Sequence, residues 1–557
     1  MHNFSTHNEL MSCFLSINKK EKAKLDKYLE FLDETGVSKI IDEELNSSQE
    51  TRGRNPFNPY KLFATIAYSF SKHSSSLRKI EESINYDLRF IYLMEQEHPS
   101  YVTISKFVNS VIVKRQREIF SCIVNRLLIK YKIPTEDVFI DGTKLEANAN
   151  KYKFVWKPTT NKIKLFQKTR ELLSKYFELP ESKQSFKAKD IGEYLSKLEN
   201  TIKDKQYSFV TGKGIRSPLI VKDYHLLSSY LIRALSYEEQ ESICGPYRNS
   251  YFKTDHDATA MCLKEDYYSG LGSNMHAGYN LQLAVSKGII LDYYVCQERN
   301  DISTLKPFLE LFYADLGYYP INVCADAGYG SIENYEYLKA HSIGNYVKPL
   351  SWQQEMDGKR IPLFRIEDNN LFCLNNKLAT IYEKYNGTYA KKKNAKLYVI
   401  ENCSRCKYKS VCKKAIKNKK ANFRIFEVSI KYNSYKEEAM SNLLSPKGIE
   451  MRINRSSQVE GSFGVIKQDM DYERVRRRGL ENVSCEIMLV CLGYVIRKLF
   501  ALIDGTAKLD YWIAPESLKP EIRPAEINFK KLLSERKPGE NEKLRRNNRK
   551  YKRRNRP

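Results

Sequence analysis

Two short apolar runs, far apart in the chain, each end in an aspartate. Residues 138–140 (Val, Phe, Ile) precede Asp141 and a glycine, and residues 323–325 (Val, Cys, Ala) precede Asp326, with a glycine two positions later. Apolar runs of this length, bounded by turn-forming residues, predict buried β-strands rather than helices. Asp141 and Asp326 are therefore each expected where a buried strand ends.

Helical spacing dominates the chain before and between these runs. Apolar positions recur every three or four residues over 60–70 and 77–94, and Pro59 marks a helix start. A lysine-rich stretch over 160–250 also predicts helices. A helix pair joined by a short break suits DNA docking, although many helical bundles share that pattern. The N-terminal region is therefore expected to be helical.

Strand signals return in the middle of the chain. Residues 278–296 predict two strands joined by a hairpin turn at Lys287-Gly288. At 557 residues the chain is too long for one compact core. We expect an α/β protein made of a helical N-terminal region over 1–125, a split core of mixed sheet and helices over 126–340 and 430–510 with a helical insertion at 150–250, a cysteine-containing insertion over 345–425, and a basic tail over 511–557.

Charge limits the kinds of partner. The sequence has 93 Lys and Arg against 67 Asp and Glu, a formal net charge of +26. Basic residues cluster over 543–557, where there is no acid, and again over 474–478. Such clusters favour nucleic acid over an evenly solvated surface or an acidic membrane face. The most apolar window, 487–503, contains two basic residues and is short for a membrane span, so it predicts a buried core helix.

A third acid lies in a segment of helical periodicity. Val459, Phe463, Ile466 and Met470 repeat at helical spacing and define one buried face, with Glu460 and Lys467 on the neighbouring stripe. Gly461 and Gly464 remove side chains there, which would let DNA or the sheet approach closely. An ordinary amphipathic helix with surface charges has the same pattern.

Three carboxylates that converge on one cleft suit the cleavage of a phosphodiester. That reaction needs an activated water and a stabilised leaving oxygen, and two divalent ions can supply both. Magnesium prefers oxygen ligands and keeps several waters, so a few carboxylates suffice to hold it. Asp141, Asp326 and Glu460 are the candidate ligands of two Mg²⁺ or Mn²⁺ ions, although a lone strand-end aspartate is more often a turn or cap residue.

Four cysteines form a second candidate metal site. Cys403, Cys406 and Cys412 are spaced C-x2-C-x5-C, and Cys373 lies upstream. Four thiolates bind Zn²⁺ tetrahedrally, and a zinc between the second and third acids would be structural. Reduced cysteines in a small irregular subdomain explain the same spacing, so both interpretations stay open.

Four segments together resemble the DDE transposases of bacterial insertion sequences, in the IS1182 group of the IS4-like class. They are FIDGTKLEANANKY, GYNLQLAV, ADAGYG and RSSQVEGSFGVIKQDM, and they occur in the family's order. The resemblance runs from about residue 50 to about residue 500. It implies an RNase H-like catalytic core with Asp141 on the first strand, Asp326 after the fourth and Glu460 on a late helix.

The resemblance also implies residues that bind DNA. Lys467, seven positions after Glu460, fits the family's lysine, whereas the arginine slot holds Ser456 and Arg455 lies one position away. Arg455 and Lys467 are thus candidate contacts to the phosphate at the DNA end. Basic segments add further candidates, which are Arg52, Arg54 and Arg476.

The expected function is the metal-dependent cleavage of insertion-sequence ends and their transfer into target DNA. The expected partners are double-stranded DNA and further copies of the chain in a homodimer or larger synaptic complex, without a membrane, in the bacterial cytoplasm at the nucleoid. A non-catalytic, zinc-containing DNA-binding regulator explains the charge and the cysteines but leaves the contexts of the acids unexplained. A phosphatase with an Asp-x-Asp-Gly-Thr loop fits less well, because Phe139 stands at the first aspartate position.

Overall fold

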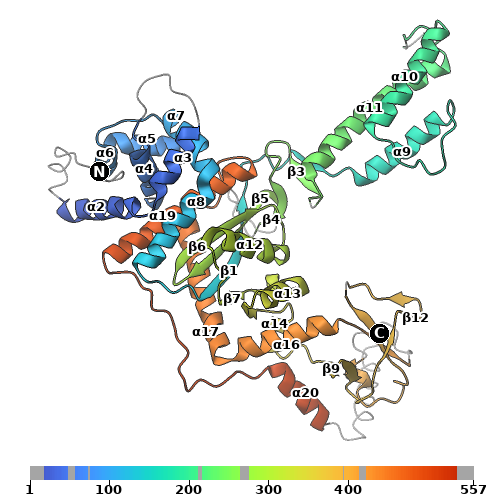
Figure 1. The fold of residues 1–557 in the computed structure, drawn as a ribbon. Helices are drawn as coiled ribbons and strands as arrows, with labels where there is room; N and C mark the ends of the chain where they lie inside the picture. The colour runs from blue at the N-terminus through green and yellow to red at the C-terminus, as the bar shows by residue number, and fades with distance from the viewer. Residues whose placement is uncertain are drawn as a thin grey trace, which may run out of the picture.

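The protein was analysed as a computed structural model that describes residues 18–47, 57–72, 76–210, 212, 216–246, 248–263, 275–392, 394–412 and 422–535. A mixed sheet lies in the centre, N-terminal helices cover one side of it, a pair of long helices projects from it, and small sheets lie at the far end (Figure 1). The predicted α/β class, with a mixed sheet and a helical N-terminal region, is confirmed.

The N-terminal region is helical throughout its described part. Asn58 caps α4 by accepting hydrogen bonds from the N–H groups of Tyr60 and Lys61, and Pro59 occupies the first turn, as predicted. The segment 77–94 divides at Asp87, whose side chain accepts from Arg89 N–H and starts a new helix. The helices are α2 (Lys19–Asp33), α3 (Val37–Ser47), α4 (Pro59–Ser71), α5 (Leu77–Tyr86), α6 (Leu88–Met94), α7 (Tyr101–Phe107), the π-turn η2 (Val108–Ile112) and α8 (Val113–Lys130).

The central sheet has six strands in the order β4-β5-β1-β7-β8, and β6 pairs with β5 on the same edge as β4, farther along the strand. β1 runs antiparallel to β5 and parallel to β7, which is parallel to β8. The predicted hairpin joins β5 to β6, where Lys287 (φ 50°) and Gly288 (φ 70°) both adopt the left-handed conformation that such turns need. The strands are β1 (Asp137–Glu146), β4 (Thr259–Cys262), β5 (Met275–Ser286), β6 (Ile289–Cys296), β7 (Asn322–Ala325) and β8 (Gly344–Val347).

The prediction that the first strand ends at Asp141 is wrong. β1 continues to Glu146 because every residue from Phe139 to Glu146 pairs with β5. β7, by contrast, ends at Ala325 as predicted, so its pairing with β1 stops at Ile140. The next described strand-like partner on that edge of β1 is Arg474, which forms an isolated bridge with Glu146. This notch begins at Asp141.

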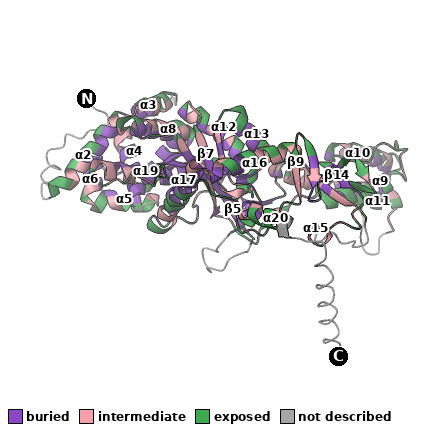
Figure 2. Cartoon of the chain, turned by 90° about the horizontal axis from the view of Figure 1, so that it is seen from below, coloured by how far each residue is buried: buried purple, intermediate pink, exposed green. Residues whose placement is uncertain are grey.

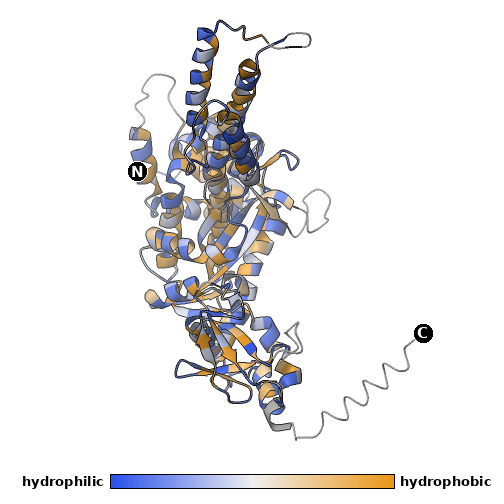
Figure 3. Ribbon diagram, turned by 90° about the vertical axis from the view of Figure 1, so that its right-hand side faces the viewer, coloured by the Kyte–Doolittle hydropathy of each residue, from blue (hydrophilic) through white to orange (hydrophobic). Residues whose placement is uncertain are grey.

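Two insertions extend from the core. The first is a helical arm, whose helices carry both apolar and polar sides (Figure 3), attached through a two-stranded ribbon. The arm has its own apolar cluster. Its elements are β2 (Phe154–Trp156), α9 (Thr159–Leu173), α10 (Ala188–Asp204), α11 (Leu219–Cys244) and β3 (Ser250–Phe252).

The second insertion lies between β8 and the last helices and consists of short antiparallel pairs. It comprises α14 (Trp352–Met356), β9 (Phe364–Glu367), β10 (Asn370–Cys373), β11 (Thr380–Tyr382), β12 (Lys384–Tyr385), β13 (Thr388–Tyr389), β14 (Lys396–Ile400), α15 (Lys409–Cys412) and β15 (Arg424–Val428). The remaining elements are the 3₁₀ turns η3 (Asp301–Ser303) and η4 (Ala327–Tyr329), and α12 (Leu305–Leu316), α13 (Ile332–Ala340), α16 (Ile430–Leu444), α17 (Pro446–Arg455), η6 (Ser456–Glu460), α18 (Gly461–Gly464), η7 (Val465–Asp469), α19 (Leu480–Ile503) and α20 (Pro524–Glu535).

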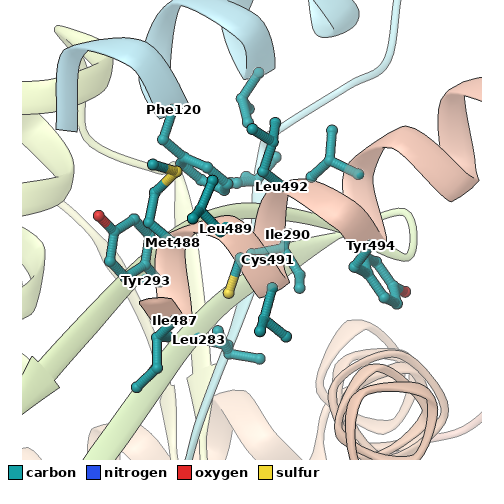
Figure 4. Close-up of a cluster of buried hydrophobic side chains, with 14 of the residues drawn as sticks. Phe120, Leu283, Ile290, Tyr293, Ile487, Met488, Leu489, Cys491, Leu492 and Tyr494 are labelled. Carbon is teal, nitrogen blue, oxygen red and sulfur yellow. The ribbon is translucent and has the colours of Figure 1, made fainter. Parts of the chain in front are cut away.

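One continuous core joins the N-terminal helices to the sheet, and burial is concentrated there (Figure 2). α19, predicted as a buried helix, lies at its centre, between α4, α8 and β6 (Figure 4). Gly493 permits the close packing of α19 against α4, since a Cβ at this position would lie 2.6 Å from the carbonyl carbon of Phe70 in α4. Across the described ranges we find no helix that is both long and apolar enough to span a membrane.

Candidate active site

Asp141 and Asp326 occupy neighbouring positions, the first within β1 and the second just after β7. β1 and β7 are parallel neighbours, and their last pair is Ile140 with Ala325. Asp141 and Asp326 come directly after that pair, so both stand at the notch where β7 ends. The topology thus joins two acids that are 185 positions apart in sequence, and it does so at the edge where open α/β sheets commonly place their functional groups.

Arg455 connects the third acid to this notch. Its guanidinium Nη1 donates to Asp141 Oδ2 at 2.9 Å, and its Nη2 lies 3.5 Å from Glu460 Oε1. The Arg455 side chain is only 8% exposed, whereas that of Glu460 is 57% exposed. One buried cation therefore joins an acid of the first strand to an acid of a late helix.

Glu460 projects from an unusual part of its helix. It ends the π-turn η6, and a second π-turn, η7, follows one turn later. Inserted π-turns are rare and occur preferentially at functional sites. Ser456 Oγ donates to Glu460 Oε2 at 3.0 Å. The predicted buried face of this helix is present, because Val459, Phe463, Ile466 and Met470 are all buried.

The charges around the two aspartates shift their pKa values in opposite directions. Burial raises the pKa of Asp141 above its ordinary value, and the nearby charge of Asp326 adds to the rise, although Arg455 opposes both. Burial alone would raise the pKa of Asp326 as well. There the Ala327 N–H, Arg455 and Lys348 outweigh burial and lower the pKa. Asp326 is thus the more readily ionised acid.

Two further residues, which sequence patterns did not single out, line the notch. Lys348 Nζ lies 3.5 Å from Asp326 Oδ1. Lys348 directly follows β8, as Asp326 directly follows β7, and this position after a strand is the sequence signal that could have identified it. Asp301 lies against Gly142 and Gly328, the glycines beside the two aspartates. It comes from the turn η3, and its approach depends on the pairing of β5 with β1.

The donor set suits a divalent cation, although the side chains are not arranged around one. Among the residues that the structure describes, no three acid, cysteine or histidine side chains are grouped as metal ligands. Arg455 lies among the acids instead, pairing with Asp141 and Glu460 and lowering the pKa of Asp326. The three carboxylates thus already surround a positive charge, and oxygen ligands are those that Mg²⁺ and Mn²⁺ prefer.

The four predicted zinc ligands lie in the second insertion. Cys373 ends β10, Cys403 follows β14, and both contact one small apolar cluster together with Cys412. Cys406 N–H donates to the Cys403 carbonyl at 3.4 Å in the turn between them. Burial raises the pKa of the Cys412 thiol, and the three other thiols add to that rise. All four are free thiols, and the fold brings them into one neighbourhood.

The candidate DNA contacts differ in setting. Arg476 is exposed in the loop before α19, and Lys467 is half-buried on η7. Arg455 is buried and faces the acids, so any phosphate that it binds must lie at the notch. Arg52 and Arg54 fall outside the described residues, as does the cluster at 543–557.

Comparison with known protein families finds two matches. Residues 14–110 match a family described as "Transposase domain (DUF772)", and residues 372–500 match one described as "Transposase DDE domain". The second match includes Glu460, Arg455, the four cysteines and most of α19. No curated protein and no solved structure matches the chain.

Proposed function

This chain is a DDE transposase, a DNA-cleaving enzyme of transposition, and we propose that Asp141, Asp326 and Glu460 are its three catalytic acids. The observation that carries the proposal is the notch itself. Asp141 and Asp326 follow the last pair of two parallel strands, and Arg455 joins Asp141 to Glu460, which lies inside the matched DDE segment.

We further propose that the core is RNase H-like and that the chain belongs to the IS1182 group. An antiparallel trio, β6-β5-β1, is followed by two parallel strands, β7 and β8, and helices pack against the sheet. The motifs around Asp141, Asp326 and Glu460 occur in the group's order. As an enzyme that acts on DNA, it would work at the bacterial nucleoid.

Asp141, Asp326 and Glu460 would hold two Mg²⁺ or Mn²⁺ ions. When bound, two such ions activate a water and stabilise the leaving oxygen of a phosphodiester. Arg455 and Lys348 place positive charge beside the acids, which would orient the phosphate of the element end. Hydrolysis breaks the P–O3′ bond and leaves a 3′-hydroxyl. In strand transfer that hydroxyl attacks a target phosphate, whose own P–O3′ bond breaks.

The proposed test is cleavage of a plasmid that carries the element's ends, with Mg²⁺ present. Asp141→Asn, Asp326→Asn and Glu460→Gln should each reduce cleavage at least about 1,000-fold, since each removes a charged ligand that supplies several kcal/mol. Glu310→Gln, at an exposed position of α12, is the matched control and should cleave normally. Full activity in any of the three acid variants would overturn the proposal.

The loop that carries Arg476 is built to hold basic side chains outward, and we propose that it contacts DNA backbone phosphate. Buried Glu486 accepts the N–H groups of Arg476 and Arg477 at 2.8–3.1 Å. The Val475 N–H donates to the carbonyl of Glu146 at the end of β1. Arg476→Ala should lower DNA affinity equally for all DNA sequences. The slope of log affinity against log salt concentration should fall by about one, since one phosphate contact is lost.

We also propose that Cys373, Cys403, Cys406 and Cys412 bind one structural Zn²⁺. Support comes from the apolar cluster that Cys373, Cys403 and Cys412 share, from the effect of the three other thiols on the pKa of Cys412, and from the C-x2-C-x5-C spacing. The full-length protein, purified without chelator, should contain one zinc per chain by elemental analysis, and Cys406→Ser should lose it. A zinc-free protein whose unfolding temperature is unchanged by chelator would contradict the site.

The enzyme would act on DNA ends as a dimer or a larger synaptic complex. The chemistry of transposition supports this proposal, because the pairing of two DNA ends requires at least two copies of the active centre. Light scattering of the purified protein with and without end DNA should give a mass of two or more chains on addition of DNA. Complexes that contain only one chain under cleavage conditions would contradict it.

A further inference from the structure

Asp301 is a carboxylate held in place by buried amides. Asn280 Nδ2 and Gln282 Nε2, both on β5, donate to its Oδ1 at 2.8 and 3.0 Å. Both amide residues are fully buried, and the hydroxyl of Tyr329 donates in turn to Gln282 Oε1. Two buried amides and a buried phenol thus fix the orientation of one half-buried acid.

This carboxylate lies against the backbone beside both catalytic aspartates. A Cβ at Gly142, the residue after Asp141, would lie 2.9 Å from Asp301 Oδ1. A Cβ at Gly328, two residues after Asp326, would lie 3.6 Å from Asp301 Oδ2. The two glycines therefore leave open the space that Asp301 occupies, and the acid lines the notch from the side of α12.

The second carboxylate oxygen of Asp301, Oδ2, lacks a described hydrogen-bond partner. Within the described ranges, its Oδ2 accepts no hydrogen bond and the carboxylate forms no ion pair, although two other acids stand close by. Holding a third negative charge at such a place costs free energy unless a cation is present. Structural packing alone gives no reason for a charged rather than a neutral group there.

We propose that Asp301 is a positioning residue of the metal site, and that its Oδ2 accepts hydrogen bonds from water on the ion held by Asp141 and Asp326. The inference rests on the proposed function of those two acids. Mg²⁺ keeps several of its waters when bound to protein, so it has donors to offer such a carboxylate. Residues in this outer position typically change metal affinity 10–100-fold when mutated.

Asp301→Asn separates the carboxylate's charge from its structural role. The asparagine Oδ1 can still accept from Asn280 and Gln282, so the network and the fold are kept. We expect the unfolding temperature without metal to be unchanged and the affinity for Mn²⁺ to fall about 10–100-fold, measured by electron paramagnetic resonance on the DNA-free, full-length protein. Asp301→Ala breaks the network as well and should also lower the unfolding temperature. Glu310→Gln is the matched control.

Two reference proteins make the outcome decisive. If wild type binds Mn²⁺, Asp141→Asn does not, and Asp301→Asn binds as tightly as wild type, then the role of Asp301 is overturned while the proposed active site stands. If wild type binds no Mn²⁺, or Asp141→Asn binds it as wild type does, the proposed active site itself fails. Weakened binding in Asp301→Asn, with unchanged thermal stability, supports both.

Discussion

Arg455 is the residue on which the charge balance of the notch depends. Its guanidinium pairs with Asp141 and Glu460, opposes the rise in the pKa of Asp141, and helps to lower the pKa of Asp326. Removing one partner of a buried ion pair leaves an uncompensated charge, which is strongly destabilising. Arg455 therefore favours the ionised forms of Asp141 and Asp326 and links Asp141 to Glu460 in the metal-free site.

Arg455→Ala should destabilise the metal-free protein by about 3 kcal/mol and shift the acid limb of Mn²⁺ binding to higher pH. The sign follows from Asp141 and Asp326, since the loss of Arg455 raises the pKa of both and they must lose their protons to bind the ion. Urea unfolding and Mn²⁺ titrations at several pH values measure the two effects. Lys339→Ala, which breaks an exposed pair with Glu438, should cost less than about 1 kcal/mol. An acid limb that does not move would refute this role.

Gly142 is the second residue with a specific requirement. Its missing side chain admits Asp301 and Gln282 to the edge of β1, where a Cβ would clash with both. Gly142→Ala should cost about 1–3 kcal/mol of stability and weaken Mn²⁺ binding together, because the Asp301 carboxylate is displaced. Gly192→Ala, in α10 with open space around it, should stabilise by up to about 1 kcal/mol and leave binding unchanged. Unimpaired Mn²⁺ binding by Gly142→Ala would show that the space is not needed.

At the scale of elements, the segment η6-α18-η7 carries Glu460 on a helix with two π-turns. Gly461 and Gly464 lie between those turns, and a Cβ at either would meet nothing within 4 Å. The sheet therefore does not require these glycines. A close approach of DNA stays a prediction, and an ordinary amphipathic helix with surface charges is the alternative to it.

Gly461→Ala and Gly464→Ala test that assignment. Each should leave stability unchanged or raise it by up to about 1 kcal/mol, as alanine favours the helix, yet lower affinity for end DNA in a fluorescence anisotropy titration. The double variant, Gly461→Ala with Gly464→Ala, should lose more DNA affinity than Gly192→Ala, whose substitution lies on the helical arm. Wild-type DNA affinity in the double variant would rule out a close approach of DNA to this face.

Local patterns were sufficient to predict a strand before Asp141, a strand before Asp326, the hairpin at Lys287-Gly288, the buried helix over 487–503 and the buried face around Val459. They failed where pairing over long distances decides the outcome. β1 continues past Asp141 because β5 lies beside it, and Asp301 and Lys348 reach the notch only through the order of strands. The π-turns likewise left no signal in the spacing of apolar residues, which remained helical.

At the scale of the whole molecule, two ion pairs of one arginine link the N-terminal helices to the core. Arg117 of α8 pairs with Asp292 of β6 and Asp315 of α12. Burial raises the pKa of Asp292 to about 7, with a further contribution from Asp315, while Arg117 opposes the rise. Removal of Arg117 would leave Asp292 and Asp315 without this shared cation at the contact of α8 with β6 and α12.

The raised pKa of Asp292 predicts a dependence of stability on pH. Below about pH 4 the folded and unfolded chains both carry the proton, and between about 4 and 7 only the folded chain does. This group's contribution to stability therefore falls as pH rises from about 4 to about 7 and is constant above that. From pH 5 to pH 8, wild type should lose about 2 kcal/mol relative to Asp292→Asn, measured by urea unfolding. An equal difference at both pH values would mean that Asp292 is ionised throughout.

The most direct test of the active centre is to map where a bound metal lies. Fe²⁺ substituted for Mg²⁺, with ascorbate and peroxide, generates radicals that cut the polypeptide near the ion, and mass spectrometry locates the cuts. Cuts clustered at residues near 141, 326 and 460, and suppressed by excess Mg²⁺ and in Asp141→Asn, are predicted. Cuts confined to other segments, or to only one of these three, would show that the acids do not share a metal site.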